Sequence, residues 1–313
     1  MAVTDLYFER MLFMITVKLK SDKLYSGPGT SYAVNITGVN GKIATVEWKE
    51  GSYYYVSLTS LGVRGYVSED DISFETAGRP RTVMPKLLKR YVSANGSAHL
   101  GPETTYRGCT SPEMGQAVYY LEEKVGDFAF IEYEVDVSSK KYRAWFPHMS
   151  LAIAPQSRLT RERYIENIET KVTPYNYEPE GSETFCNRYA FYAMKECNAN
   201  LPTKSDGVTP GNCQEMYDKL ITNQFSKWRM VDFAEAQHRA NFGCPTIAIS
   251  PNVSGYRGHV AVVRPNDGST PNSKADVKIT QAGSKVWVNV TLNWGWDTES
   301  TAYDAIRFFT WLY

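Results

Sequence analysis

A histidine stands near the head of the apolar run Gly258-His-Val-Ala-Val-Val263, which follows a turn rich in glycine and serine. A short run of β-branched residues after such a turn predicts a buried strand. Side chains alternate between the two faces of a strand, so His259, Ala261 and Val263 share one face. We therefore expect His259 at the end of a sheet, where an imidazole can face the start of a helix.

Other short apolar runs complete the predicted sheet, and they cover residues 246–250, 277–281 and 286–292. The chain before the sheet carries apolar residues at steps of three and four, which predicts helices. These helices cover residues 157–171, 185–197 and 231–241. Helices followed by an antiparallel sheet are typical of an α+β domain.

Cys186 lies in the first turn of the predicted helix 185–197. Unpaired N–H groups and the positive end of the helix dipole stabilise a thiolate there and lower the pKa of the thiol. A cysteine among tyrosine, phenylalanine and alanine is also typical of a small buried side chain. The pairing with His259 favours the reactive interpretation, in which Cys186 is a nucleophile and His259 is its base.

A third polar group is needed to hold the imidazole in the reactive tautomer. Gln281 ends the strand predicted beside that of His259, and its amide oxygen can accept the second ring N–H. Asn293 and Asp297 are the alternatives. The sequence thus predicts the catalytic residues Cys186, His259 and Gln281, and this chemistry requires no metal or organic cofactor.

The first half of the chain alternates short β-prone runs with turn residues, among them Asn40-Gly41, a strong hairpin signal. A Gly-Pro pair followed by a tyrosine occurs twice, in Leu24-Tyr-Ser-Gly-Pro-Gly-Thr-Ser-Tyr32 and in His99-Leu-Gly-Pro-Glu-Thr-Thr-Tyr106. The repeat indicates an internal duplication.

The 313 residues include 34 Lys plus Arg and 34 Asp plus Glu, so the formal net charge is zero and we expect no nucleic-acid partner. No segment reaches the roughly 18 apolar residues that cross a bilayer. The five cysteines lack CxxC spacing, so structural zinc is not expected. The apolar run from Met11 to Val17 follows acidic residues and precedes no cleavage site, which predicts a strand and synthesis in the cytoplasm without a signal peptide.

The duplicated first half resembles bacterial SH3-type domains. In that family an early strand ends in a Gly-Pro turn and a late strand contains Gly-Tyr-Val, present here as Gly65-Tyr-Val67. The second copy departs from this pattern, since Arg143-Ala-Trp-Phe146 stands at the late strand. The resemblance implies modules that bind peptidoglycan, and the alternative is a structural spacer.

The second half resembles the papain-like wall hydrolases of the CHAP type (cysteine, histidine-dependent amidohydrolase/peptidase) and their NlpC-type relatives. Four motifs in the same order carry the resemblance: Thr184-Phe-Cys-Asn187, Ala236-Gln-His-Arg-Ala-Asn-Phe-Gly243, Gly258-His-Val-Ala-Val-Val-Arg-Pro265 and Ile279-Thr-Gln-Ala-Gly283. CHAP enzymes usually have an acidic residue or asparagine where Gln281 stands. NlpC-type enzymes usually have Asp-Cys-Ser where this chain has Phe-Cys-Asn, so CHAP is the better match.

These resemblances imply an α+β chain with a papain-like C-terminal domain, its helices packed on an antiparallel sheet, after two small all-β SH3-like barrels. The expected domains are 1–78, 79–155 and 156–313. The implied function is hydrolysis of an amide bond in the stem peptide or cross-bridge of peptidoglycan, at the bacterial wall, after release by a route without a signal peptide. The alternatives are a thiol hydrolase acting on another amide and a non-catalytic wall-binding protein. The sequence makes no prediction of oligomeric state.

Overall fold

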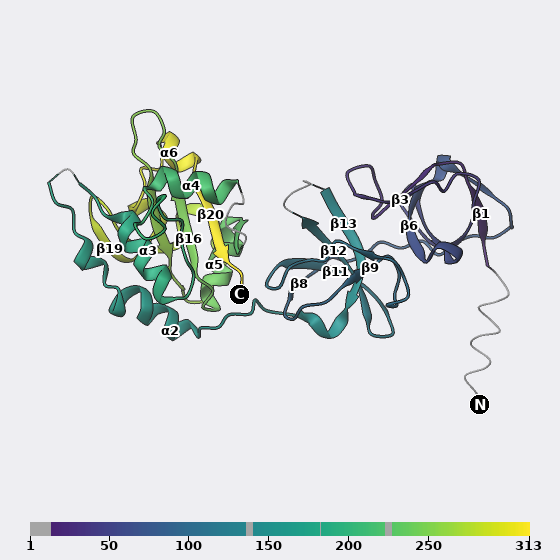
Figure 1. Ribbon diagram of the computed structural model, residues 1–313, viewed down its shortest axis with the longest axis horizontal. Coiled ribbons are helices and arrows are strands. Elements are labelled where there is room, and N and C mark those ends of the chain that lie inside the picture. The colour runs from purple at the N-terminus through teal and green to yellow at the C-terminus, as the bar shows by residue number, and fades with distance from the viewer. Residues whose placement is uncertain (1–13, 136–139, 182, 223–226) are drawn as a thin grey trace. The chain divides into compact units, whose positions relative to one another are not determined.

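The computed structural model describes residues 14–135, 140–181, 183–222 and 227–313 (Figure 1). The chain divides into two compact units, Met1–Ile153 and Ala154–Tyr313. Of the apolar run predicted as the first strand, residues 11–13 lie outside the described residues. The first described strand begins at Thr16.

The first unit contains two antiparallel sheets of seven strands each. The first sheet comprises β1 (Thr16–Leu19), β2 (Lys23–Tyr25), β3 (Val34–Thr37), β4 (Ile43–Glu50), β5 (Tyr53–Leu58), β6 (Val63–Ser68) and β7 (Ile72–Phe74). The second comprises β8 (Leu88–Val92), β9 (Ala98–His99), β10 (Gly108–Cys109), β11 (Ala117–Val125), β12 (Phe128–Val135), β13 (Lys140–Pro147) and β14 (Leu151–Ala152).

The two sheets have the same strand order. The first runs β3-β2-β6-β5-β4-β1-β7 and the second β10-β9-β13-β12-β11-β8-β14, so every strand has a counterpart. The repeated Gly-Pro motif also serves the same purpose twice. A Cβ added at Gly27 would lie 2.2 Å from the ring of Tyr32, and one at Gly101 would lie 2.1 Å from the ring of Tyr106, so only glycine admits these rings. The internal duplication predicted from the sequence is confirmed.

A cluster of large side chains joins the two sheets, and its buried members are Trp48, Tyr55, Tyr66, Leu121, Phe130 and Trp145. The rings of Trp48 and Tyr55 stack with centroids 4.2 Å apart. The indole N–H of Trp145 donates to the Tyr55 hydroxyl across 3.0 Å. Large aromatic side chains with satisfied polar ends contribute strongly to such a core. The two sheets therefore share one interface.

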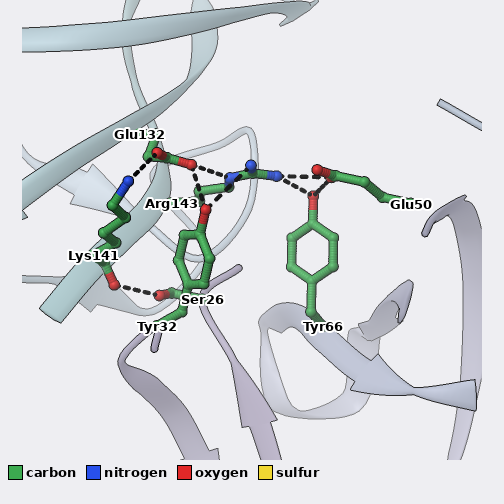
Figure 2. Close-up of polar contacts among 7 residues, drawn as sticks. All are labelled: Ser26, Tyr32, Glu50, Tyr66, Glu132, Lys141 and Arg143. Atoms are coloured by element: carbon green, nitrogen blue, oxygen red, sulfur yellow. Dashed lines mark hydrogen bonds and ion pairs between the residues drawn. The ribbon is translucent and has the colours of Figure 1, made fainter. Parts of the chain in front are cut away.

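A buried ion cluster accompanies this aromatic interface, and we call it the Arg143 cluster (Figure 2). The guanidinium of Arg143, on β13, donates to Glu132 at 2.8 Å and to Glu50 at 2.7 Å. The hydroxyl of Tyr32 donates to Glu132 at 2.6 Å, and that of Tyr66 donates to Glu50 at 2.9 Å. Because Glu50, Tyr32 and Tyr66 belong to the first half of the unit and the other two to the second, the cluster joins the duplicated copies.

The second unit contains one six-stranded antiparallel sheet in the order β15-β20-β16-β17-β18-β19. Its strands are β15 (Trp228–Val231), β16 (Thr246–Ser250), β17 (His259–Val263), β18 (Lys278–Ala282), β19 (Val286–Thr291) and β20 (Arg307–Trp311). The helices are α2 (Arg161–Glu166), which continues as a π-helical turn (Asn167–Lys171), α3 (Cys186–Glu196), α4 (Cys213–Ile221), α5 (Phe233–Asn241) and α6 (Thr301–Asp304). Helix α3 contacts β17 and β18, whereas α4 contacts β16 (Figure 1).

Several local predictions are confirmed in this unit. The predicted helices 185–197 and 231–241 correspond to α3 and α5, and the four predicted strands correspond to β16 through β19 within one or two residues. The sequence reading missed α4, α6 and the two strands β15 and β20. These last strands pair with each other over Trp228–Val231 and Arg307–Trp311, two segments far apart in the chain.

The predicted fold class is wrong. We expected an α+β chain with a papain-like domain of helices packed on a sheet, preceded by two small SH3-like barrels. The described residues instead form three antiparallel sheets of seven, seven and six strands, and the α-helices, which belong to the second unit, are few and short, so the protein is mostly β. The physical reason is non-local pairing, because short segments such as Ile72–Phe74 and Arg307–Trp311 complete sheets that local periodicity does not predict.

Among the described residues, no helix combines the length and the apolar character needed to span a membrane.

Candidate active site

The three residues predicted to carry chemistry lie where α3, β17 and β18 meet. Cys186 is the first residue of α3, His259 is the first residue of β17, and Gln281 lies in β18. The antiparallel register of the two strands places Gln281 across from Ala261, and alternation puts His259 on the same face. The structure thus brings the three side chains together, while their role in catalysis stays a prediction.

The imidazole of His259 is oriented by the side-chain amide of Gln281. The distance from His259 Nε2 to Gln281 Oε1 is 2.5 Å. The amide nitrogen of Gln281 donates to the backbone carbonyl of Lys285 at 3.4 Å, which turns the amide oxygen toward the ring. An amide oxygen only accepts hydrogen bonds, so Nε2 carries the proton and Nδ1 is the nitrogen available to Cys186.

The thiol of Cys186 is only 4% exposed, yet its pKa is lowered well below the usual range. The largest cause is the hydrogen bond from the thiol of Cys213, whose Sγ lies 3.5 Å from that of Cys186. The charge of His259, a hydrogen bond with its ring and one from the backbone N–H of Val260 act in the same direction. Together they outweigh burial, which by itself would favour the neutral thiol.

The pKa of His259 is raised above its ordinary value. Burial of the ring is the largest influence and favours neutral imidazole, but the charge and hydrogen bond of Cys186 and the hydrogen bond of Gln281 outweigh it. A lowered thiol pKa beside a raised imidazole pKa favours the thiolate–imidazolium ion pair. The pair therefore places a thiolate beside an imidazolium.

Packing around the imidazole and the amide leaves them little freedom. Trp296 meets the ring of His259 edge to face, with centroids 4.5 Å apart, and its indole N–H donates to the Ser250 hydroxyl at 2.9 Å. A Cβ added at Gly295 would lie 2.7 Å from the amide oxygen of Gln281. That oxygen can therefore reach the ring only because position 295 lacks a side chain.

Two pockets open on the two sides of the site. One, of about 560 Å³, is lined by Cys186 and Cys213 and by the cationic side chains of Arg188, Lys204 and Arg257. The other, of about 680 Å³, is lined by His259 and Gln281 together with aromatic and polar side chains that include Tyr256, Trp287, Trp294 and Trp296. Thr184, Arg257 and Gly258 line both pockets. The first pocket thus has polar and cationic walls, and the second has aromatic ones.

The alternatives to Gln281 line the second pocket but make other bonds. The side-chain oxygen of Asn293 accepts from the Thr291 hydroxyl at 2.6 Å, and that of Asp297 accepts from the backbone N–H of Glu299 at 3.1 Å. Asn187, the residue after Cys186, donates its side-chain N–H to the carbonyl of Gly211 at 2.9 Å. The geometry therefore favours Gln281 as the partner of the imidazole.

The sequence did not identify Cys213 as part of the site. A signal was present, because Asn212 and Glu215 have the spacing of a capping box. Such a box starts a helix and would have placed Cys213 in a first turn, as Cys186 is. The proximity of the two sulfur atoms could not be predicted, since 27 residues separate them in the chain.

No group of three or more histidine, cysteine, aspartate or glutamate side chains within the described ranges could hold a metal ion.

No protein-family model matches this chain, and no curated protein matches it. Among solved structures, it is similar to NlpC1 from Trichomonas vaginalis, with 12% identity and a TM-score of 0.20 over 88% of this chain and 93% of that one. NlpC2 from the same organism has 12% identity and a TM-score of 0.20, over 87% of this chain and 99% of the other. An NlpC/P60 family protein from Bacillus cereus ATCC 10987 has 10% identity and a TM-score of 0.25, over 94% and 98%. At such scores the likeness carries no argument about this site.

Proposed function

We propose that the second unit hydrolyses amide bonds, with Cys186 as nucleophile, His259 as acid and base, and Gln281 as the residue that orients the imidazole. One observation carries the proposal. The thiol pKa is lowered and the imidazole pKa is raised in the same buried pair, and that pair lines two pockets. Perturbed groups that a substrate can reach are typical of catalytic sites.

The geometry supports a two-step reaction through an acyl-enzyme. The Cys186 thiolate attacks the amide carbonyl, and the imidazolium of His259 gives its Nδ1 proton to the departing amine as the C–N bond breaks. The neutral imidazole then takes a proton from a water molecule, which attacks the thioester. The C–S bond breaks, the acid is released and the thiolate returns.

Negative charge on the carbonyl oxygen is stabilised from the start of α3. The backbone N–H of Cys186 belongs to the first turn, where helix N–H groups lack intrahelical partners. The residue before it, Phe185, has an apolar side chain that makes no hydrogen bond to these donors. A donor of this kind acts on charge that develops in the transition state.

The substrate we propose is the peptide part of peptidoglycan. Support comes from the four motifs around Cys186, His259 and Gln281 that resemble wall hydrolases of the CHAP type. The cationic lining near Arg188 and Arg257 suits the carboxylates of a short acidic peptide. The bacterial wall is accordingly the proposed place of action.

Binding to the wall through the first unit is the second part of the proposal. Tyr32, Tyr54 and Tyr55 are all buried, so they contribute to packing rather than to an exposed surface. Tyr119 on β11 is 41% exposed and is an aromatic contact that remains available. A pelleting assay with the inactive Cys186→Ala protein tests this part, because loss of wall binding after Tyr119→Ser would support it. Pelleting that persists after Tyr119→Ser and in fragment 154–313 would assign binding to the second unit.

Digestion of purified peptidoglycan tests the main proposal, with mass spectrometry of the new amino and carboxyl termini. We expect new peptide termini with wild type and none with Cys186→Ala. Labelling with iodoacetamide at neutral pH separates an enzyme from a binding protein. A Cys186 labelling rate no faster than that of a free model thiol would favour the non-catalytic alternative.

A further inference from the structure

A second cysteine adjoins the proposed nucleophile, and the mechanism makes no use of its chemistry. The Sγ atoms of Cys186 and Cys213 lie 3.5 Å apart. Both side chains are buried, at 4% and 7% exposure, but both line the pocket of about 560 Å³. A small solute that enters this pocket can therefore reach the two sulfur atoms together.

The chain holds this cysteine pair in place by contacts that do not involve sulfur. The carbonyl of Gly211 accepts from the side chain of Asn187 in the first turn of α3, which ties the approach to α4 to the start of α3. A reciprocal capping box between Asn212 and Glu215 then fixes Cys213 as the first residue of α4. The close approach of the two thiols therefore results from where two helices begin.

The two thiols also differ in charge state, which suits them to successive steps. The pKa of Cys186 is lowered, so it is the thiolate that meets an oxidant first. The pKa of Cys213 is raised, mainly by its hydrogen bond with Cys186 and then by burial, so it stays a thiol until that charge is gone. Oxidation of Cys186 removes the negative charge and with it the main cause of this raised pKa.

We propose that Cys186 and Cys213 form a reversible disulfide that protects the proposed nucleophile from hydroperoxides. This inference rests on the proposed function only in taking Cys186 as the reactive thiolate. The Cys186 thiolate attacks the terminal peroxide oxygen, the O–O bond breaks, hydroxide or alkoxide leaves, and a sulfenic acid forms. The sulfur of Cys213 then attacks that of Cys186, an S–S bond forms, and water leaves with the proton of Cys213. The two thiols supply the two electrons that reduce the peroxide, and an external dithiol reverses the change by exchange.

Two other buried cysteines, Cys197 and Cys244, have different neighbours and serve as controls within the same protein. Cys244 donates to the carbonyl of Gln156 at 3.7 Å, and burial raises its pKa to about 11. Cys197 accepts from the side chain of Asn167 at 3.7 Å, and burial raises its pKa to about 12. Raised thiol pKa values make both slow to react with peroxide.

The experiment treats the full chain with hydrogen peroxide, blocks free thiols with iodoacetamide in denaturant, and maps the peptides by mass spectrometry. We expect one cross-linked peptide pair containing Cys186 and Cys213, with the loss of two hydrogen atoms, while Cys197 and Cys244 carry the alkyl label. Dithiothreitol should return both cysteines to the labelled form. Cys244→Ser, the matched control, should give the same cross-link as wild type.

Cys213→Ser removes the resolving thiol and should divert the oxidation. We expect peroxide to take Cys186 to the sulfinic acid, which dithiothreitol does not reduce. The peptide map of the wild-type protein tests the disulfide even if Cys213→Ser folds poorly. A wild-type map with sulfinic acid at Cys186 and a labelled Cys213, or with Cys186 unoxidised, would overturn the proposal. The peptide mass reports the disulfide and not hydrolysis, so the two proposals can fail separately. A cross-link in a protein that cleaves no amide would reject the proposed hydrolase activity and support the proposed disulfide.

Discussion

Two of the places where the described residues bury polar groups differ in kind, since one is a structural cluster and the other contains the proposed reactive pair. In the first unit the guanidinium of Arg143 meets the carboxylates of Glu132 and Glu50 between two sheets. In the second unit Cys186 meets His259 where a helix and two strands converge. Both sets contain groups with shifted pKa values, so a shift alone does not mark an active site.

The difference lies in what the burial does to the charges. The carboxylate of Glu132 keeps its ordinary charge, and its pKa is lowered even against burial because Tyr32 and Arg143 hydrogen-bond to it. The donors of that cluster already have acceptors within it, as Arg143 has Glu132 in its own sheet and Glu50 in the other (Figure 2). The thiol of Cys186 instead becomes charged where a free thiol is neutral, and it lines a pocket. Reactivity requires both an unusual charge state and a route for the substrate.

Removing the nucleophile should produce the largest effect. We expect Cys186→Ala to lower amide hydrolysis by about 10⁴-fold or more while leaving the fold intact, because a small side chain at a helix end is lost. The rate of appearance of new amino groups, with circular dichroism beside it, measures this. Cys197→Ala, which removes a buried thiol from another part of the core, is the control. Near-normal hydrolysis in Cys186→Ala would show that Cys186 is not the nucleophile and that its pair with His259 is not the reactive site.

Removing the arginine from the Arg143 cluster tests the structural side. Arg143→Met should destabilise the first unit by about 3–5 kcal/mol, because the carboxylates of Glu132 and Glu50 lose the buried guanidinium, and Glu132 keeps the half-exposed Lys141 at 3.4 Å. Denaturant unfolding measures the loss, and hydrolysis of a soluble peptide should be unchanged, since the proposed site lies in the second unit. A parallel loss of hydrolysis would show that the two regions are not independent.

Acid should also weaken the Arg143 cluster, because protonation of a carboxylate removes one of its charges. The folded pKa of Glu132 is lowered from the ordinary value of 4.5, so its stabilising contribution is fully present above that value. The contribution is lost as the pH falls through the folded pKa, because protons then bind the carboxylate in the folded state as well. Unfolding of the first unit followed from pH 7 to pH 2 measures this, and Glu132→Gln should flatten the acid part of the curve.

Removing the amide that orients His259 should cost less than removing the nucleophile. We expect Gln281→Ala to lower turnover by about 10- to 100-fold, because the ion pair persists but the ring is free to turn. Steady-state rates compare this variant with wild type and Cys186→Ala. Full activity in Gln281→Ala, with a loss in Asn293→Ala or Asp297→Ala, would pass the orienting role to that residue.

The smallest effect should be a shift in pH dependence. Gln281→Glu places a carboxylate beside His259, which favours the imidazolium and raises the imidazole pKa further. The basic limb of the rate profile should therefore move upward by about one pH unit. The lowered pKa of Cys186 also predicts alkylation by iodoacetamide at pH 6, where ordinary thiols are protonated. A pH–rate profile of Gln281→Glu that overlays the wild-type profile would show that a charge at position 281 does not change the pKa of the His259 ring.

The sequence determined the features that depend on neighbouring residues. Alternation of apolar side chains located β17 with His259 at its head, and steps of three and four residues located α3 with Cys186 in its first turn. The repeated Gly-Pro and tyrosine motif predicted the duplication, because each tyrosine ring needs a nearby glycine to lie against. Such patterns depend on strand and helix geometry, which is local.

Only the tertiary structure decided which distant segments meet. Pairing of β15 with β20 and the contact between Cys186 and Cys213 both join segments that no local pattern relates. The same holds for Arg143, which stands where the second copy departs from Gly-Tyr-Val and reaches Glu50 in the first copy. Pairing partners are selected by the burial and hydrogen bonding of the whole core, so residues whose role depends on a distant partner acquire it only on folding.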